Sequence, residues 1–331
     1  MNIGINGFGR IGRQTARIAI TCPSIDSIHV NDLSDIETLS HLFKYDSIHG
    51  KFPIKFTLKG NELHFENGKK ISFSNEKEPI NIPWKKEGIS TVIECTGIFL
   101  TYDGAKKHLD AGAKKVILSA PAKSDNIPSI VYGVNDFKLT GKELIISNAS
   151  CTTNNAAALL FILDKLLTIE SCYISTIHSY TSDQKIHDSP HRDLRRARAA
   201  AMSIVPTSTG AAKAIGKIIP SLSGKIQGGS FRVPIPNGSI SEITLVCKEN
   251  KSVEEINAAI KNASNSVLKN ILGYTEEPLV SSDIIGLKDS CLFDSSLTRV
   301  IGKMIKVVGW YDNEVGYSCR LIDLTLKTHS K

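Results

Sequence analysis

No apolar stretch of the sequence approaches the length needed to cross a bilayer, although 41% of its residues are hydrophobic. The first residues already have the composition of a strand, so we expect no signal peptide and a cytoplasmic protein. The seven cysteines include no Cys-x-x-Cys pair. In a reducing compartment this spacing predicts free thiols, without disulfides and without a metal site.

The sequence also lacks internal repeats, low-complexity segments and any nucleic-acid-binding motif. We therefore expect neither a membrane nor a nucleic acid as a partner. The net charge of +7 is typical of a solvated basic surface or of one that attracts anions such as phosphates. A length of 331 residues suffices for two domains with hydrophobic cores.

A polar stretch at residues 147–154 separates a short apolar run from a longer one. The run before it predicts a buried strand, and residues 155–163 predict a helix. Ser150 is suited to cap this helix, which places Cys151 in its first turn. Unpaired backbone N–H groups and the helix dipole favour a thiolate there. A nucleophilic cysteine is thus favoured over a buried structural one.

The N-terminal residues carry a dinucleotide-binding pattern. Residues 7–12 follow G-x-G-x-x-G, with a predicted strand before them and a predicted helix after them. Such glycines allow a tight turn and close approach to a pyrophosphate. Asp32 lies about 20 residues beyond Gly12, where a carboxylate accepts hydrogen bonds from an adenosine ribose. Because Asp32 would repel a 2′-phosphate, the pattern favours NAD over NADP.

The remaining first half predicts a sheet that is parallel in part. We expect strands at residues 54–58, 62–65, 70–73, 91–95 and 115–121, and helices at 35–45 and 103–111. Asn67-Gly68 indicates a hairpin. Thr96, Gly97 and Ser119 lie at the ends of predicted strands, which suits a ligand at the carboxyl edge of the sheet.

The second half changes character after about residue 147. We expect strands at residues 172–178, 231–233, 240–247 and 304–310, and helices at 211–219, 252–272 and the C-terminus. Long antiparallel strands with flanking helices indicate an α+β domain. The predicted fold class is therefore α/β, with an N-terminal Rossmann domain and an α+β catalytic domain that has a mostly antiparallel sheet.

Two features of this half bear on chemistry. His178 ends a predicted strand before a polar loop, which favours a general base over a structural histidine. The basic run at residues 191–198 is typical of a solvated face, or it supplies anion ligands. Ser208, Thr209 and Gly210 open a predicted helix and offer an anion site at its N-terminus.

Five motifs together resemble phosphorylating glyceraldehyde-3-phosphate dehydrogenase of the bacterial glycolytic type. They lie at residues 6–13, 147–154, 178–184, 193–201 and 310–318, within a collinear match from residue 2 to about 325. The resemblance implies a homotetramer. It also implies an NAD-binding Rossmann domain (1–148), a catalytic domain (149–313) and a C-terminal helix (314–331) that packs back on the first domain.

The resemblance implies roles for individual residues. Cys151 is the nucleophile and His178 its base. Contacts to NAD are implied for Gly7, Gly9, Arg10, Ile11, Asp32, Lys77, Thr96, Gly97, Ser119, Asn313 and Tyr317, of which Asn313 orients the nicotinamide amide. The substrate phosphate is implied to contact Thr181 and Arg232, with Asp183 nearby. Inorganic phosphate is implied to contact Ser150, Thr152, Arg196, Thr209 and Gly210.

The implied reaction oxidises glyceraldehyde 3-phosphate to 1,3-bisphosphoglycerate in glycolysis or gluconeogenesis, through a thiohemiacetal and a thioester on Cys151. The sequence departs from the family at Lys77, where arginine is common, at Asn155, where a second cysteine is common, and at Val315, where an aromatic residue is common. The alternatives are an erythrose-4-phosphate dehydrogenase and a binding protein that retains the fold. Intact Cys151, His178 and Arg232 argue against the latter.

Overall fold

The computed structural model describes residues 1–329, which form two compact units. The first comprises Met1–Ile130, Phe137–Ala149 and the chain from Ser318 onward. The second comprises Val131–Asp136 and Ser150–Tyr317. The functional roles expected for residues 1–148, 149–313 and 314–331 stay predictions.

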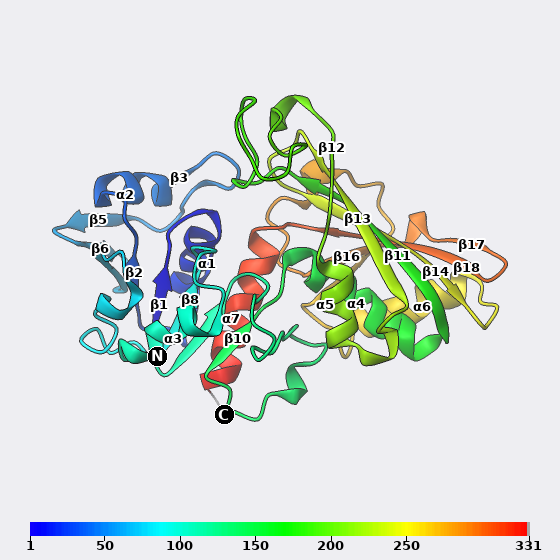
Figure 1. Ribbon diagram of the computed structural model, residues 1–331, viewed down its shortest axis with the longest axis horizontal. Helices are drawn as coiled ribbons and strands as arrows, with labels where there is room; N and C mark the ends of the chain where they lie inside the picture. Colours follow the sequence, from blue (N-terminus) through cyan, green and yellow to red (C-terminus); the bar gives the residue numbers. More distant parts are fainter. Residues whose placement is uncertain (330–331) are drawn as a thin grey trace. The chain divides into compact units, whose positions relative to one another are not determined.

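The first unit is built on an eight-stranded sheet in the order β10-β9-β8-β1-β2-β7-β6-β5 (Figure 1). The six strands from β10 to β7 pair in parallel, and β5 and β6 extend the sheet antiparallel beyond β7. The parallel strands are β1 (Asn2–Asn6), β2 (Ser27–Asn31), β7 (Lys70–Ser74), β8 (Thr91–Glu94), β9 (Lys115–Leu118) and β10 (Ile145–Ser147). The antiparallel strands are β5 (Phe56–Lys59) and β6 (Glu62–Phe65).

This sheet places a ligand site at its centre. The strand order reverses at β1, so loops leaving β1 and its neighbours diverge at the carboxyl edge, as in dinucleotide-binding folds. Helices of this unit are α1 (Arg10–Thr21), α2 (Ile36–Lys44) and α3 (Tyr102–Asp110), and a short ribbon joins β3 (Tyr45–Asp46) to β4 (Gly50–Lys51). The Rossmann prediction is confirmed.

Two glycines after β1 are required by geometry. Gly7 has φ +92°, a left-handed conformation that side chains disfavour. A Cβ at Gly12 would lie 2.1 Å from the Gly7 carbonyl oxygen. Helix α1 can therefore approach the loop after β1 only because residue 12 has no side chain.

The second unit contains a mixed sheet in the order β12-β13-β11-β14-β18-β16-β15, with β17 paired to β18. Only the β11–β13 and β15–β16 pairs are parallel, which confirms a mostly antiparallel sheet. The long strands are β11 (Ile169–Ser179), β13 (Ile226–Val233), β14 (Ser239–Cys247) and β18 (Met304–Tyr311). The short strands are β12 (Val205–Thr207), β15 (Leu272–Thr275), β16 (Cys291–Asp294) and β17 (Arg299–Ile301).

Helices cover one face of this sheet. Figure 1 shows α4 (Cys151–Leu166), α5 (Ala211–Ile218) and α6 (Val253–Ser264) together on that face. Helix α4 contacts β11, β14, β16 and β18, while α5 contacts β13. The last helix, α7, spans Val315–His329. The face beneath α4 is therefore where β11 can present side chains to Cys151.

One predicted helix is too long. The segment expected to be helical over residues 252–272 begins with a capping box of Ser252 and Glu255, but the helix ends at Ser264. Asn270 then adopts φ +64°, and Leu272 starts β15. Buried Leu268 and Leu272 continue the apolar spacing of a helix beyond its end, which explains the error.

Within residues 1–329, none of the helices combines the length and the hydropathy needed to cross a membrane. Over the same residues, no three or more histidine, cysteine, aspartate or glutamate side chains are arranged to hold a metal ion. All seven cysteines are free thiols.

Candidate active site

Cys151 begins helix α4, as predicted. The Ser150 side chain caps the helix by accepting a hydrogen bond from the Thr153 amide at 3.1 Å. Ala149, immediately before, has φ +54°, which is unusual for a residue with a side chain. This sharp entry into the helix leaves the Cys151 Sγ 3.4 Å from His178 Nε2. The two residues predicted as nucleophile and base are thus neighbours.

A second contact lies behind the histidine. Arg232 Nη1 lies 2.7 Å from His178 Nδ1 and donates to the Ser179 carbonyl oxygen at 3.0 Å. The strand register explains this proximity, because β11 and β13 pair in parallel with His178 directly opposite Arg232. His178 Nδ1 also lies 2.7 Å from the Ser179 carbonyl oxygen, which orients the ring. Nucleophile, base and cation therefore form one cluster.

Burial decides the protonation of this pair. It lowers the pKa of His178 to about 3, and the adjacent Arg232 charge acts in the same direction. Burial raises the pKa of the Cys151 thiol, although Arg232 and the Thr152 amide and hydroxyl oppose it. The backbone at the helix start lowers the pKa of the thiol, as expected, but burial shifts it further in the opposite direction. Both shifts favour the uncharged forms, a thiol and a neutral imidazole, and Nε2 is the ring atom placed to accept the thiol proton.

Asn313 is fixed by two serines. Its Oδ1 accepts hydrogen bonds from Ser179 Oγ and Ser239 Oγ, both at 2.9 Å, and all three side chains are buried. Because the amide oxygen is occupied, the amide nitrogen is the group left to donate elsewhere. Such a fixed donor suits recognition of a carbonyl oxygen.

A pocket of about 520 Å³ lies at the carboxyl edge of the first unit's sheet. Its lining includes the predicted cofactor residues Gly7, Gly9, Asp32, Lys77 and Thr96. Asp32 accepts a hydrogen bond from the Phe8 amide at 2.7 Å, which holds the glycine loop beside the carboxylate.

The pocket fits a dinucleotide. Gly9 caps α1 without a side chain, and a Cβ added to it would meet nothing within 4 Å. An anion can therefore occupy the helix N-terminus above this residue. Of the other predicted residues, Arg10 and Ile11 lie in α1, where Arg10 Nη1 pairs with Asp46 Oδ2 at 2.5 Å. Gly97 follows β8, and Ser119 follows β9. Tyr317 is buried in α7.

Comparison with known proteins gives the same assignment along the chain. Residues 1–102 match "Glyceraldehyde 3-phosphate dehydrogenase, NAD binding domain", and residues 150–313 match the C-terminal domain of the same family. The chain is 50% identical to glyceraldehyde-3-phosphate dehydrogenase of Geobacillus stearothermophilus, covering 100% of this chain and 99% of the relative. It is 51% identical to the Mycobacterium avium protein of that name, covering 98% and 97%. The chain belongs to the glyceraldehyde-3-phosphate dehydrogenase family. NAD is accordingly its cofactor.

Two departures from the common glyceraldehyde-3-phosphate dehydrogenase pattern have structural partners. Asn155, where a second cysteine is common, donates from Nδ2 to the Trp310 carbonyl oxygen at 3.2 Å and so joins α4 to β18. The Val315 amide donates to Asp312 Oδ1 at 2.8 Å at the start of α7, a contact that does not depend on its side chain. Lys77 lines the dinucleotide pocket.

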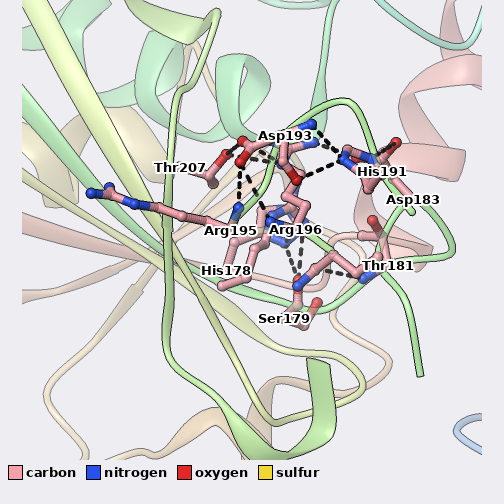
Figure 2. Close-up of polar contacts among 11 residues, drawn as sticks. His178, Ser179, Thr181, Asp183, His191, Asp193, Arg195, Arg196 and Thr207 are labelled. Atoms are coloured by element: carbon pink, nitrogen blue, oxygen red, sulfur yellow. Dashed lines mark hydrogen bonds and ion pairs between the residues drawn. The ribbon is translucent and has the colours of Figure 1, made fainter. Parts of the chain in front are cut away.

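Arg196 lies in a cluster that differs from the predicted grouping (Figure 2). It forms an ion pair with Asp183 and donates from Nε to Thr207 Oγ1 at 2.9 Å. Asp183, which was predicted to lie near Arg232, thus pairs with Arg196. His191 Nε2 lies 3.5 Å from Asp183 Oδ1. The polar contacts described for Arg196 do not include Thr209, whose hydroxyl accepts from the Ala211 amide at 3.2 Å. The predicted pairing of Arg196 with Thr209 and Gly210 stays a prediction.

Sequence reasoning missed one residue of the site. Tyr311, at the end of β18, places its hydroxyl 2.9 Å from Thr152 Oγ1 and its ring edge-on to His178. It is buried, and burial raises the pKa of its hydroxyl. The only signal was its position inside the motif at residues 310–318, because Thr152 and Tyr311 meet only in the folded sheet.

Proposed function

We propose that this chain oxidises glyceraldehyde 3-phosphate to 1,3-bisphosphoglycerate, with inorganic phosphate as the second substrate and Cys151 as the nucleophile. The proposal rests on the Cys151 Sγ lying 3.4 Å from His178 Nε2 with Arg232 directly behind the ring. A thiol, a neutral base and a cation in one cluster are what covalent aldehyde oxidation of an anionic substrate requires.

The residues divide the reaction among them. His178 takes the Cys151 proton as sulfur adds to the aldehyde carbon and passes it to the former carbonyl oxygen, which gives a neutral thiohemiacetal and returns His178 to its neutral form. It then accepts the hydroxyl proton of that adduct while the carbon is oxidised. NAD, when bound, supplies the acceptor for the hydride. Inorganic phosphate attacks the resulting thioester, the carbon–sulfur bond breaks, and Cys151 is regenerated with the acyl phosphate as product.

One assay tests this function. NADH formation is measured with glyceraldehyde 3-phosphate, with and without inorganic phosphate, and in parallel with erythrose 4-phosphate. Sustained turnover that requires both the triose phosphate and inorganic phosphate supports the proposal. Higher catalytic efficiency with erythrose 4-phosphate would favour that alternative activity. No NADH with either aldehyde, together with measurable NAD binding, would indicate a binding protein.

We propose that the two arginines bind different phosphates. Arg232, together with Thr181, binds the phosphate of the substrate, and Arg196 binds inorganic phosphate. Arg232→Ala should raise the KM for glyceraldehyde 3-phosphate, and Arg196→Ala should raise the KM for inorganic phosphate while a single-turnover burst of NADH persists. Loss of one charge-assisted contact corresponds to about 10- to 150-fold. Steady-state and stopped-flow kinetics measure both.

Arg198→Ala is the matched control for these variants, because Arg198 lies in the same loop but is mostly exposed and pairs with Asp188. It should leave both KM values unchanged. If Arg196→Ala and Arg232→Ala change the two KM values in the same ratio, the two arginines do not have separate roles.

We further propose a homotetramer in the cytoplasm. Side chains alternate across a strand, so the face of the second sheet opposite His178 carries Tyr173 and Phe231, both substantially exposed. Leu194, Met202 and Ile204 of the adjoining segment are also exposed, Met202 at 85%. Tyr173, Leu194 and Phe231 line one surface hollow, and exposed apolar side chains grouped in this way are typical of subunit interfaces. Sedimentation equilibrium at micromolar concentration should give four times the 36.0 kDa chain mass, and a monomer would contradict the proposal.

A further inference from the structure

A line of buried hydrogen bonds runs beneath the dinucleotide pocket. At its first end, Asn31 holds the backbone of Glu76 twice: Oδ1 accepts from the Glu76 amide at 2.8 Å, and Nδ2 donates to the Glu76 carbonyl oxygen at 2.9 Å. Asn31 Nδ2 also donates to Asn6 Oδ1 at 2.9 Å. Asn6 Nδ2 in turn donates to Glu94 Oε2 at 2.7 Å. Asn6, Asn31 and Glu94 are all buried.

The donor and acceptor roles along this chain of hydrogen bonds are fixed at both of its ends. The Glu76 amide can only donate, so Asn31 must turn its oxygen toward it and its nitrogen toward Asn6. Asn6 must then present its own nitrogen to Glu94. A carboxylate can only accept, so Glu94 requires the same orientation that Glu76 imposes. A glutamine at position 94 would place its NH₂ group against another hydrogen-bond donor, so it could not replace the carboxylate in this network.

Glu94 also fixes the opposite side of the pocket. Its Oε1 accepts from the Thr96 amide at 2.7 Å and from the Thr96 hydroxyl. Its Oε2 lies 3.0 Å from His108 Nε2, and Trp84 Nε1 donates to His108 Nδ1 at 3.1 Å, so the ring proton is on Nε2 and faces Glu94. The carboxylate is completely buried and therefore depends on these donors.

Both groups of residues that Glu94 holds line the pocket. Asn6, Asn31 and Glu76 form one part of the lining beside Asp32, and Thr96 forms another. We propose that Glu94 is a positioning residue for the adenosine half of NAD, setting both sides of that end of the pocket without touching the cofactor. This deepens the assigned NAD site and rests on the proposed function only in taking NAD as the ligand.

The test compares two ligands. In Glu94→Gln the NH₂ group faces either the Asn6 and His108 donors or the Thr96 amide, whichever way the side chain turns. Dissociation constants for NAD and for ADP-ribose, measured by calorimetry, should both rise about tenfold. The kcat at saturating NAD should stay within about twofold of the wild type. A merely destabilised protein would not lose affinity for both ligands in parallel while keeping kcat.

Glu62→Gln is the matched control, since Glu62 is a partly exposed carboxylate of the same unit that pairs with Lys70. It should bind ADP-ribose as the wild type does. A second pair of variants changes His108, which contacts Glu94 but does not line the pocket. His108→Met removes the donor to Oε2 and should weaken ADP-ribose binding several-fold, whereas His108→Gln keeps one acceptor and one donor and should restore it.

The outcomes separate the two proposals. Wild-type affinity for ADP-ribose in Glu94→Gln, or equal affinity in His108→Met and His108→Gln, would overturn the role of Glu94. If Glu94→Gln does not fold, the His108 variants decide, and the shift in Tm on adding ADP-ribose reports binding in a destabilised variant. A wild-type protein that binds ADP-ribose but forms no NADH from glyceraldehyde 3-phosphate would instead refute the proposed function and leave this test intact.

Discussion

Cys151→Ser should lower the kcat for NADH formation by about 10⁴-fold or more while the protein stays folded. A serine hydroxyl remains protonated at neutral pH and is a far poorer nucleophile than sulfur. The replacement is nearly isosteric, and the Ser150 cap and the first turn of α4 do not depend on the Cys151 side chain. Circular dichroism and Tm should therefore match the wild type, and NAD affinity should be unchanged.

Chemical labelling tests the same assignment in the wild type. Mild alkylation should modify Cys151 first, because His178 Nε2 lies 3.4 Å from its sulfur and can take up the thiol proton, and should abolish activity in proportion to the modification. Burial raises the pKa of Cys95 and of Cys172 to about 12, so these thiols should react slowly. Cys22→Ser is the control for the substitution, because Cys22 is also a partly buried thiol but lies in the first unit. Alkylation of Cys95 or Cys291 ahead of Cys151, with activity retained, would contradict the assignment.

His178→Asn should lower kcat by about 10²- to 10⁴-fold, the range expected for loss of a general base. An asparagine side chain cannot take up a proton from the thiol or from the thiohemiacetal hydroxyl. The rate of the NADH burst should fall, since one proton transfer precedes the oxidation that forms the thioester and the other accompanies it. Stopped-flow measurement of the burst, set against steady-state kcat, checks this step directly.

His64→Asn is a suitable control for that variant, because His64 lies in β6 and contacts Glu62 rather than the cluster at Cys151. It should leave the burst unchanged. A His178→Asn variant with a normal burst but slow steady turnover would place the histidine in thioester breakdown instead, and the assignment as base for oxidation would be wrong.

The sequence was most informative where chemistry and local structure coincide. Ser150 as a cap predicted the start of α4 and hence the place of Cys151, because capping depends on residues a few positions apart. The glycines at positions 7 and 12 predicted the loop after β1 for the same reason.

Contacts between distant strands could not be predicted in this way. His178 meets Arg232 only because β11 and β13 pair in register, and Thr152 meets Tyr311 only through the packing of α4 on β18. The protonation of the pair was also out of reach, since it depends on burial that no local pattern reports. The ion pair between Arg196 and Asp183 depends on how the loop between β11 and β12 folds back on itself.

The register that sets His178 opposite Arg232 also determines which changes in chain length the site can tolerate. The chain between the two strands runs through a long irregular segment and helix α5, and residues added at an exposed turn there need not alter strand pairing. A single residue inserted within β13 ahead of Arg232 would send its guanidinium to the other face of the sheet. Exposed turns of the segment between β11 and β13 can therefore vary in length, whereas the number of residues within each of the two strands cannot.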